Sequence, residues 1–576
     1  MSEPEPRAGR TSRYVAGALF CIGAIVLLWI VVPPRLTVFP AMDEGVYLTA
    51  ADRIGRGQMI YRDFFEFLPP GYFYLLGFLA RFPGLGIAGL RALMVLVMAV
   101  HACILWALAR RFVRVPFAAA LFALLYVVPQ IQQHTVLSHH PLSLMLSDLT
   151  LLLLLRYRQG EPWSLPLAAL SCTACTLCTQ SQGALTLLAA LGCLFVTRPL
   201  SRRSWLLESA VIVGLCMGVW LGVVLWLLFH GALGPAFYDC VEWVLTSYRH
   251  FNATGVAYFD GRACIMRALR GTGSLIRRMD SATTAAFLGY GQVAAFCMYP
   301  ILRRRWPALL GHSHARRELD MLVIFAVAAW AACFGLPNPM MVVQTSTLGY
   351  LAALGLCVLL IWHWTERSHA QVRRLIRAAP LAVLFLQLSA AASHQVRETR
   401  RTQRVNIAAR GQSLWVDPSC VHRQASLLEF LRAKLPRGSA IFAVHWSAWL
   451  YHLGDYRNPT RYDGLIPIYN NPEQLQEAVR DLDSTRPEYV LCDDVIGSLV
   501  KRGDPRFLKL KDQDPNLWPH MKYIHQHYEL AKDFGGLRLY QRKDSIARCL
   551  VGSHDSTTTD AKPGLSSDGP GLIRQR

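Results

Sequence analysis

Two adjacent acids, Asp43 and Glu44, are the residues whose types and setting point most directly to chemistry. They follow the first apolar segment and the Pro-Pro pair at 33–34, and aromatic residues such as Phe39 and Tyr47 flank them. A carboxylate that takes a proton from a hydroxyl works best at the edge of a dry pocket, where its pKa can be tuned. We therefore predict that Asp43 is a general base and that Glu44 is its catalytic neighbour. The plainer alternative is a pair of solvated surface acids.

The composition is that of a membrane protein. Of the 576 residues, 53% are hydrophobic and 17% are charged, and the mean hydropathy is +0.28. A typical soluble chain has roughly 25% charged residues. The apolar residues form blocks close to the roughly 20 residues that span a bilayer. The predicted fold class is an α-helical polytopic membrane protein with about eleven transmembrane helices and a small extracytoplasmic α/β domain at the C-terminus.

The apolar blocks give the positions of these helices. The first begins near Tyr14 and ends at Val32, because the two prolines that follow cannot continue a helix. The other predicted spans are 87–109, 116–131, 141–155, 163–180, 183–197, 206–229, 281–302, 319–336, 341–363 and 377–393. A helix at 44–54 is expected to lie on the membrane surface, and the apolar run 72–82 is expected to be interfacial or re-entrant.

The arginines set the orientation and explain the net charge of +21. Every second loop is rich in arginine, whereas outer loops such as 132–140 and 336–340 are nearly free of Lys and Arg. Cytoplasmic loops carry such an excess, so the charge does not indicate nucleic-acid binding. The arginine-rich loops are 110–114, 156–158, 198–203, 303–317 and 367–377. The pattern predicts a multi-pass bacterial inner-membrane protein with a cytoplasmic N-terminus and Asp43 on the periplasmic side.

The chain divides into four parts by composition. Residues 1–13 form a cytoplasmic N-terminus, and residues 14–393 form the transmembrane module, with a first outer loop at 33–86 and a long outer loop at 230–280. Residues 394–545 read as a periplasmic α/β domain, and the Ser/Thr/Asp/Gly-rich segment 546–576 is expected to be disordered. In the α/β domain we predict helices at 427–435 and 472–482 and strands at 440–445, 489–492 and 537–540.

Further polar residues lie near the predicted outer face or inside the spans. His139 and His140 could face Asp43 across a cavity as catalytic groups or metal ligands, or could simply be interfacial histidines. Asp148 lies inside a predicted span, where an acid is costly, so it either acts or pairs with a buried arginine such as Arg91. The cysteines that recur every three residues read as small packing residues: Cys172, Cys175 and Cys178.

Three runs give the chain a family resemblance. They are MDEGVYLTAA at 42–51, GQMIYRD at 57–63 and LPPGY at 68–72. Together they resemble the first outer loop of GT-C superfamily glycosyltransferases, and more closely the bacterial branch related to protein O-mannosyltransferases and the lipid A aminoarabinose transferase. The sequence-level likeness covers about residues 38–75 and, more weakly, 451–462. The resemblance implies an inverting enzyme that uses a polyprenyl-phosphate-linked sugar.

The resemblance also implies roles for particular residues. Asp43 matches the family's catalytic Asp, and Glu44 matches the second acid, which would orient a neighbour or help to hold a metal. The turn at 69–71 would position the interfacial segment beside the donor lipid. Relatives often carry a lysine where this chain has TQSQG at 179–183. The donor phosphate, which needs positive charge, is therefore expected to contact other residues: Arg62, Arg249, His250 and Gln180.

The acceptor side is expected to use residues from several segments. The candidates for contacting the acceptor or supporting the site are His139, His140, Asp148, Tyr61 and Arg461. In the outer domain, His445, Trp446 and Trp449 could stack on an acceptor sugar, although ordinary packing is the plainer reading. No cofactor is assigned, and a divalent metal held by Asp43, Glu44 and His139 is left open.

The predicted function is inverting transfer of a sugar, a hexose or a pentose, from a polyprenyl-phosphate donor to an extracytoplasmic glycan, lipid or protein. The partners would be the lipid-linked donor, the acceptor and the bilayer, with no nucleic acid. A transporter or flippase of lipid-linked saccharides is the alternative. It would share the helical core but would not need the long first loop or the outer domain. A non-catalytic assembly subunit is a third reading.

Overall fold

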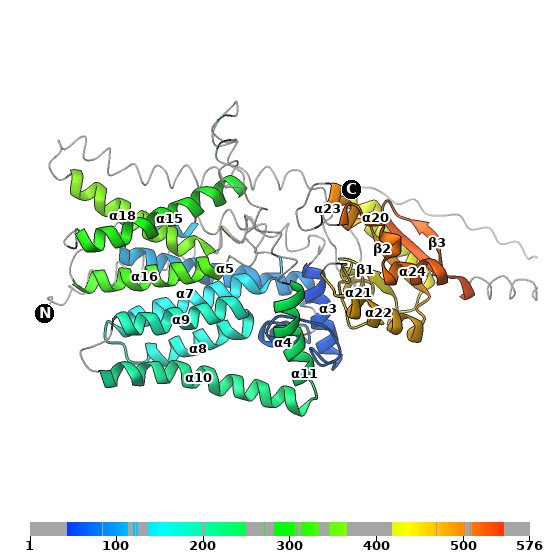
Figure 1. Ribbon diagram of the computed structural model, residues 1–576, viewed down its shortest axis with the longest axis horizontal. Helices are drawn as coiled ribbons and strands as arrows, with labels where there is room; N and C mark the ends of the chain where they lie inside the picture. The colour runs from blue at the N-terminus through cyan, green and yellow to red at the C-terminus, as the bar shows by residue number, and fades with distance from the viewer. Residues whose placement is uncertain are drawn as a thin grey trace, which may run out of the picture.

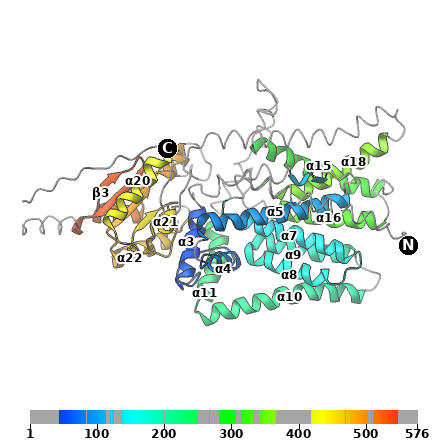
Figure 2. The same ribbon diagram turned by 180° about the vertical axis from the view of Figure 1, so that it is seen from behind.

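A bundle of long helices meets a smaller unit built on a β-sheet in the computed structural model (Figure 1). The structure describes residues 43–82, 85–112, 119–120, 122–124, 136–197, 202–248, 266, 270, 281–305, 307, 313–332, 342, 345–365, 418–467, 469–501, 507 and 510–545. The predicted helical fold with a C-terminal sheet is thus present, and Figure 2 shows the same two parts from behind.

The bundle helices fall on the predicted spans. They are α5 (Gly86–Phe112), α7 (His139–Tyr157), α8 (Ser164–Cys178), α9 (Gln180–Val196), α10 (Arg202–Phe229), α15 (Ser281–Arg305), α16 (Ser313–Ala332) and α18 (Thr347–Thr365). Of the described helices, two are long and apolar enough to cross a membrane by length and composition, at Gly86–Phe112 and Ser204–Phe229. Spans 14–32 and 377–393 and most of 116–131 lie outside the described residues, so the total number of helices stays a prediction.

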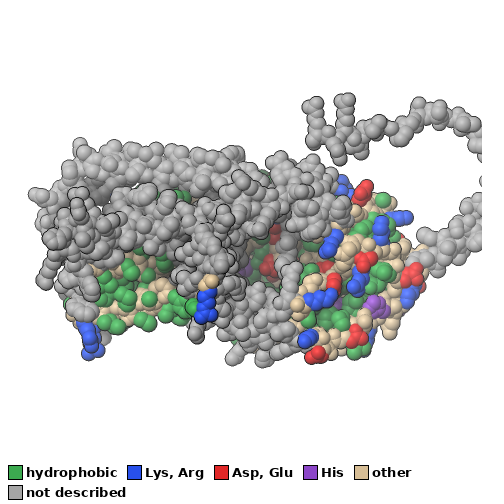
Figure 3. Space-filling view, turned by 90° about the horizontal axis from the view of Figure 1, so that it is seen from above, with side chains coloured by type: hydrophobic (Ala, Val, Ile, Leu, Met, Phe, Trp, Pro, Cys, Tyr) green, Lys and Arg blue, Asp and Glu red, His purple; other side chains and the backbone are tan. Residues whose placement is uncertain are grey.

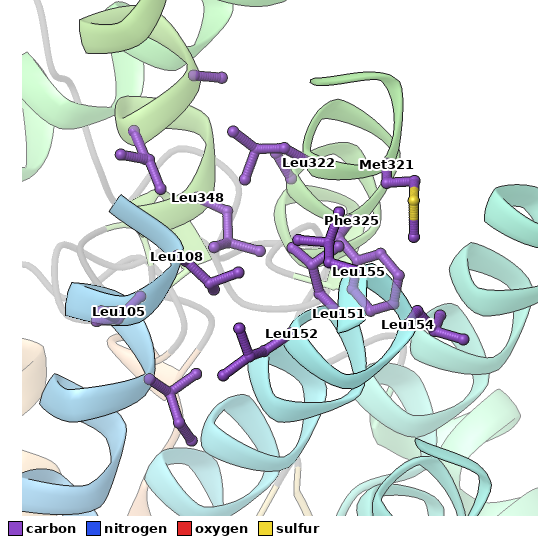
Figure 4. Packing of buried hydrophobic residues seen from close by; sticks show 14 of the residues in the cluster. Leu105, Leu108, Leu151, Leu152, Leu154, Leu155, Met321, Leu322, Phe325 and Leu348 are labelled. Carbon is purple, nitrogen blue, oxygen red and sulfur yellow. The ribbon is translucent and has the colours of Figure 1, made fainter. Parts of the chain in front are cut away.

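Leucines from neighbouring helices fill the core of the bundle. Helix α7 packs against α5, α8 and α16, and the side chains between them are almost completely buried. The close packing of these side chains provides the van der Waals contacts that hold helices together inside a membrane. Figure 4 shows the side chains at this junction, among them Leu105, Leu108, Leu151, Leu155, Leu322, Phe325 and Leu348.

Helix α10 presents its apolar side chains outward instead. Leu207, Met217 and Leu228 are each more than half exposed. A large exposed apolar surface marks contact with lipid or with another protein, so α10 has the surface that a membrane span requires. Figure 3 shows apolar side chains over the bundle, whereas charged side chains gather over the sheet unit.

The sheet unit has four strands in the order β1-β2-β4-β3. β1 (Phe442–Val444) runs parallel to β2 (Tyr489–Asp493), and β4 (Leu537–Arg542) is antiparallel to both β2 and β3 (Tyr528–Asp533). β1, β2 and β4 confirm the predicted strands. The helices of the unit are α20 (Pro418–Lys434), α21 (Trp449–Gly454), α22 (Pro472–Thr485), α23 (Val495–Lys501) and α24 (Pro519–His527), with a 3-10 turn at Pro515–Leu517.

Two short helices join the bundle to the sheet unit. α3 (Asp43–Gly55) and α4 (Pro70–Leu79) pack on each other, and α3 also packs on α21. A Cβ atom on Gly45 would lie 2.6 Å from the backbone nitrogen of Trp449, so the backbones of α3 and α21 approach each other closely. Leu48, with 0% exposure, belongs to a core shared with residues of the outer unit. The predicted helix at 44–54 is therefore confirmed, but protein rather than the membrane surface covers its apolar side.

Candidate functional site

Asp43 is the first residue of α3, and its side chain is exposed. The N-terminal end of a helix stabilises negative charge, because its backbone N–H groups and its dipole point that way. Burial raises the pKa of Tyr47, Glu66 and Tyr469, and the charge of Asp43 contributes to each increase. Asp43 thus lies at an accessible position within electrostatic range of buried acidic and phenolic groups.

Glu44 points the other way and is buried by the bundle. Arg91 of α5 donates to both of its oxygens, from Nε to Oε1 at 2.7 Å and from Nη2 to Oε2 at 2.5 Å. The backbone N–H of Leu137 donates to Oε1 at 3.1 Å. Both charged side chains are 1% exposed. A bidentate pair of this kind fixes the start of α3 against α5, which fits the orienting role predicted for Glu44 better than a metal ligand.

Of the two alternatives for Asp148, a catalytic role or a pair with a buried arginine such as Arg91, the pair with Arg91 is not formed, because Arg91 binds Glu44. Asp148 instead bonds His101 of α5, with Nε2 and Oδ2 2.8 Å apart. The reason is where the residues lie along the helices. Asp148 is about two turns into α7, beside His101 of α5. Arg91 is near the start of α5, at the end that meets α3. Asp148 is therefore a buried partner of α5 and is not brought to Asp43.

Glu66 and Asp239 are acids of the site that sequence reasoning missed. The Glu66 N–H donates to Asp239 Oδ2 at 3.4 Å, and both side chains are buried. Burial raises the pKa of Glu66 well above its usual value, and the charges of Asp463, Asp239 and Asp43 raise it further. Burial also raises the pKa of Asp239 to about 7. Among the described residues, Glu66 Oε1 and Asp239 Oδ1 have no hydrogen-bond partner.

A signal for Glu66 was present in the sequence. It is the lone acid of the run FFEFL at 64–68, and an acid among aromatic residues is rarely buried without a purpose. Asp239 gave no such signal. It lies in the π-helical turn η1 (Tyr238–Glu242), which follows the short helix α11 (Leu233–Phe237), and π-helical turns are frequent at functional sites.

Arg461 and Tyr61 tie the outer unit to this acidic cluster. Arg461 Nη2 donates to the Tyr61 carbonyl at 2.5 Å and lies 3.4 Å from Asp239 Oδ2. The Phe65 N–H donates to the Arg461 carbonyl at 2.8 Å. Tyr61 has a φ of 70°, a strained value for a residue with a side chain, and its hydroxyl donates to the Leu68 carbonyl at 2.7 Å. The turn that carries Glu66 is therefore held from both sides.

Two of the four predicted phosphate-binding residues, Arg62 and Gln180, are among the described residues. The exposed Arg62 donates to Asp63 Oδ1 at 2.8 Å and to the His230 carbonyl at 3.0 Å. Gln180, at the start of α9, donates to the carbonyl of Phe67, next to Glu66. Arg249 and His250 lie outside the described residues. Of this group, Gln180 is the residue whose contact the structure brings beside Glu66.

His139 reaches α3 through Tyr47. The Tyr47 hydroxyl and His139 Nδ1 are 2.9 Å apart, and the rings of His139 and His140 are 3.9 Å apart. Ser138 caps α7 by accepting from the His140 N–H at 3.4 Å. Within the part of the chain that the structure describes, no three His, Cys, Asp or Glu side chains are grouped as metal ligands. Asp43, Glu44 and His139 accordingly do not form a metal site, because both carboxylate oxygens of Glu44 accept hydrogen bonds from Arg91.

Aromatic rings from three segments form one wall next to the acids. Phe67 lies 5.2 Å from Trp243 and 4.9 Å from Tyr248 of η2 (Val244–Tyr248), measured between ring centroids. Tyr469 of the outer unit lies 4.8 Å from Trp243. Trp243 is completely buried, whereas Phe67, Tyr248 and Tyr469 are partly exposed and keep surface on which a sugar can stack. Of the outer-unit residues predicted to stack, Trp449 is instead buried against α3, and His445 Nδ1 faces the Asp493 carbonyl at 3.0 Å.

Asp239→Asn is expected to remove a pH dependence of stability. The pKa of Asp239 is about 7 in the folded protein and 3.8 without burial, so the folded state holds this proton more tightly. The contribution of this protonated carboxyl to the free energy of unfolding is complete below about pH 4 and is lost as the pH rises through about 7. In detergent, the melting temperature of the Asn variant relative to that of the wild type should therefore be higher at pH 8 than at pH 5. The exposed control Asp512→Asn should show no such trend, and a constant difference for Asp239→Asn would contradict the prediction.

The fold is shared with two solved structures. ArnT from Cupriavidus metallidurans bound to undecaprenyl phosphate superimposes with a TM-score of 0.50 and 13% sequence identity, over 91% of this chain and 97% of that chain. The apo state of ArnT gives a TM-score of 0.50 and 14% identity, over 93% and 99%. No family model matches the sequence, and no curated protein matches it. The predicted resemblance to the aminoarabinose transferase is thus confirmed as a resemblance of fold.

Proposed function

We propose that this protein is a multi-pass membrane glycosyltransferase that moves a sugar from a polyprenyl-phosphate donor to an acceptor outside the cytoplasm. The observation that carries the proposal is Asp43, an accessible carboxylate at a helix N-terminus beside a buried acidic cluster. The fold supports it, because a protein of the same fold was solved with undecaprenyl phosphate. The bundle would lie in the inner membrane, with α3 and the sheet unit in the periplasm.

The reaction follows from the position of Asp43. The acceptor hydroxyl loses its proton to the Asp43 carboxylate as its oxygen attacks the anomeric carbon of the sugar. A C–O bond to the acceptor forms while the bond from the anomeric carbon to the phosphate oxygen breaks. The polyprenyl phosphate leaves with the electron pair. Attack opposite the leaving group inverts the sugar configuration.

Each neighbour of Asp43 has a part in this scheme. The Glu44–Arg91 pair positions the start of α3, so that the base is held at a fixed place. The wall of Phe67, Trp243 and Tyr469 keeps water from the donor sugar. Arg62 or Arg461 would balance the charge on the leaving phosphate, together with the predicted Arg249 and His250.

A divalent cation would fit Glu66 and Asp239 better than the predicted set. Their Oε1 and Oδ1 atoms are buried and, among the described residues, unpartnered, and carboxylate oxygens suit hard cations. When bound there, such an ion would neutralise charge on the phosphate oxygens. Burial raises the pKa of both carboxyls, which favours their protonated forms when no ion is bound.

The deciding experiment separates transfer from transport. The full-length protein is reconstituted in liposomes that contain undecaprenyl phosphate carrying labelled mannose or labelled aminoarabinose, with candidate glycan and lipid acceptors outside. We expect protein-dependent release of undecaprenyl phosphate and labelled acceptor. Movement of the intact donor across the bilayer without transfer would favour the flippase, and neither activity would favour the assembly subunit.

A further inference from the structure

A pocket opens between the C-terminal half of α3 and the segment that follows α21. Its lining includes Arg53, Arg56, Gln58, Tyr456, Arg457 and Asn458, and it is called the arginine pocket here. Ten residues of α3 separate Asp43 from Arg53, which is about 15 Å along a helix. The pocket is therefore distinct from the site around Asp43, and it lies on the joint between the helix that bears Asp43 and the sheet unit.

Arg53 forms a closed wall of the pocket. Its Nη2 donates to Asp463 Oδ1 at 2.7 Å and to the Thr460 carbonyl at 2.9 Å, and its Nη1 donates to Gln58 Oε1 at 3.2 Å. The side chains of Arg53 and Asp463 are 7% and 2% exposed. Because this guanidinium is buried and bound to Asp463, Thr460 and Gln58, Arg53 fixes the wall of the pocket.

Arg56 and Arg457 are placed differently. Arg56 Nη2 donates to Asp455 Oδ1 at 2.8 Å, but the two side chains are 38% and 34% exposed. An exposed pair of this kind contributes little to stability and exchanges readily with another anion. The exposed Arg457, which also lines the pocket, donates from Nε to the Gly438 carbonyl at 2.6 Å. Two guanidinium groups thus border the same small space.

Tyr456 supplies a buried donor without a partner. The residue is 1% exposed, and among the described residues its hydroxyl makes no hydrogen bond. A Cβ atom on Gly454 would lie 2.3 Å from the Tyr456 ring, so the ring packs directly on the glycine and any side chain there would displace it. Burial raises the pKa of Tyr456, which keeps the hydroxyl protonated as a donor. Tyr456 lines the pocket, and a buried donor without a partner calls for an acceptor.

The one acid that lines the pocket is already matched. Asp52 Oδ2 lies 2.9 Å from His452 Nδ1, and the side chains are 15% and 8% exposed. Asn458 is also matched, because its Nδ2 donates to the Tyr462 carbonyl and to Asp463 Oδ1, at 2.8 and 2.9 Å. The groups that remain to face a ligand are the guanidinium ends of Arg56 and Arg457 and the Tyr456 hydroxyl. These are donors, and the first two are permanently charged.

We propose that the arginine pocket binds a phosphate-class anion, in the form of a phosphomonoester. Arg56 and Arg457 donate to its oxygens in the planar geometry that suits phosphate, and the Tyr456 hydroxyl donates to a third oxygen. A phosphorylated soluble saccharide and a phosphate headgroup of a lipid present the same chemistry. Bound there, the anion would link α3 to the sheet unit. The proposal stands without the transferase assignment, since none of its residues is needed for sugar transfer.

The test is a titration of the full-length, detergent-solubilised protein with inorganic phosphate against chloride of equal ionic strength. We expect phosphate to raise the melting temperature. The apparent Kd should weaken about tenfold or more in Arg457→Gln, because a charge-assisted pair is lost. Tyr456→Phe, which keeps the ring, should weaken binding less, and the exposed control Arg480→Gln should bind as the wild type does.

A second arm distinguishes the two sources of phosphate. Glycerol 3-phosphate in solution is compared with short-chain phosphatidic acid in the micelle, and tighter binding of one of them identifies the physiological class. The proposal is overturned if inorganic phosphate gives the wild type no shift beyond that of chloride. It is also overturned if Arg457→Gln and Tyr456→Phe both bind phosphate with the wild-type Kd.

Discussion

Asp43→Asn is expected to lower sugar-transfer turnover by roughly 10²–10⁴-fold, the usual contribution of a general base. The amide keeps the shape of the side chain but cannot accept the proton of the acceptor hydroxyl. Asp43 is exposed on the first turn of α3, so the fold should survive the change. The cost to stability is limited to the favourable interaction of an acid with the helix N-terminus, about 0.3–1 kcal/mol.

Turnover is measured in membranes at matched expression, with the labelled undecaprenyl-phosphate sugar that the wild type uses. Asp512→Asn provides the matched control, because it makes the same change at an exposed position of the sheet unit. The control should keep wild-type turnover. Wild-type turnover in Asp43→Asn at equal expression would rule out Asp43 as the base.

Glu44→Gln and Arg91→Met should each destabilise the protein by about 3–5 kcal/mol, because either change leaves a buried charge without its partner. Both side chains are 1% exposed, and the pair is bidentate. The double variant removes both charges and should lose much less than the sum of the single variants.

Thermal unfolding in detergent and the yield of folded protein measure these changes. Arg56→Met is the control, since it removes an arginine from an exposed ion pair and should have a small effect on stability. Additive losses in the double variant would show that Glu44 and Arg91 do not stabilise the protein as a pair. Turnover of the double variant, if it folds, then reports whether a fixed start of α3 is needed for catalysis.

The sequence was most informative where one local pattern dominates. Apolar runs such as 141–155 and 206–229 coincide with α7 and α10, because a long apolar block leaves few alternatives to a helix. The Pro-Pro-Gly run predicted a turn, and α4 begins at Pro70, where a proline fits the first turn of a helix. Asp43 was singled out because it lies next to another acid in an apolar setting, and its role as the base stays a prediction.

What could not be predicted depends on contacts across long stretches of chain. Arg91 follows Glu44 by 47 residues, and Asp239 follows Glu66 by 173, so no spacing rule joins them. β3 was not predicted, because all of its residues after Tyr528 are exposed and the sequence lacks the alternation of apolar and polar residues that marks a half-buried strand. The surface helix at 44–54 was assigned to the membrane because the sequence does not reveal that α21 covers it.

The packing of α3 on α21 has a consequence for the order of biosynthesis. Thr49 donates to the Ala448 carbonyl at 2.9 Å, across 399 residues of chain. At the usual rate of about 5–20 residues per second, the ribosome needs roughly 20–80 s to make the residues between them. During that time α3 has been made but has no sheet unit to bury its apolar side. The nascent protein therefore holds Asp43 on an incomplete support, and any activity that depends on this packing should appear only after α21 has been made.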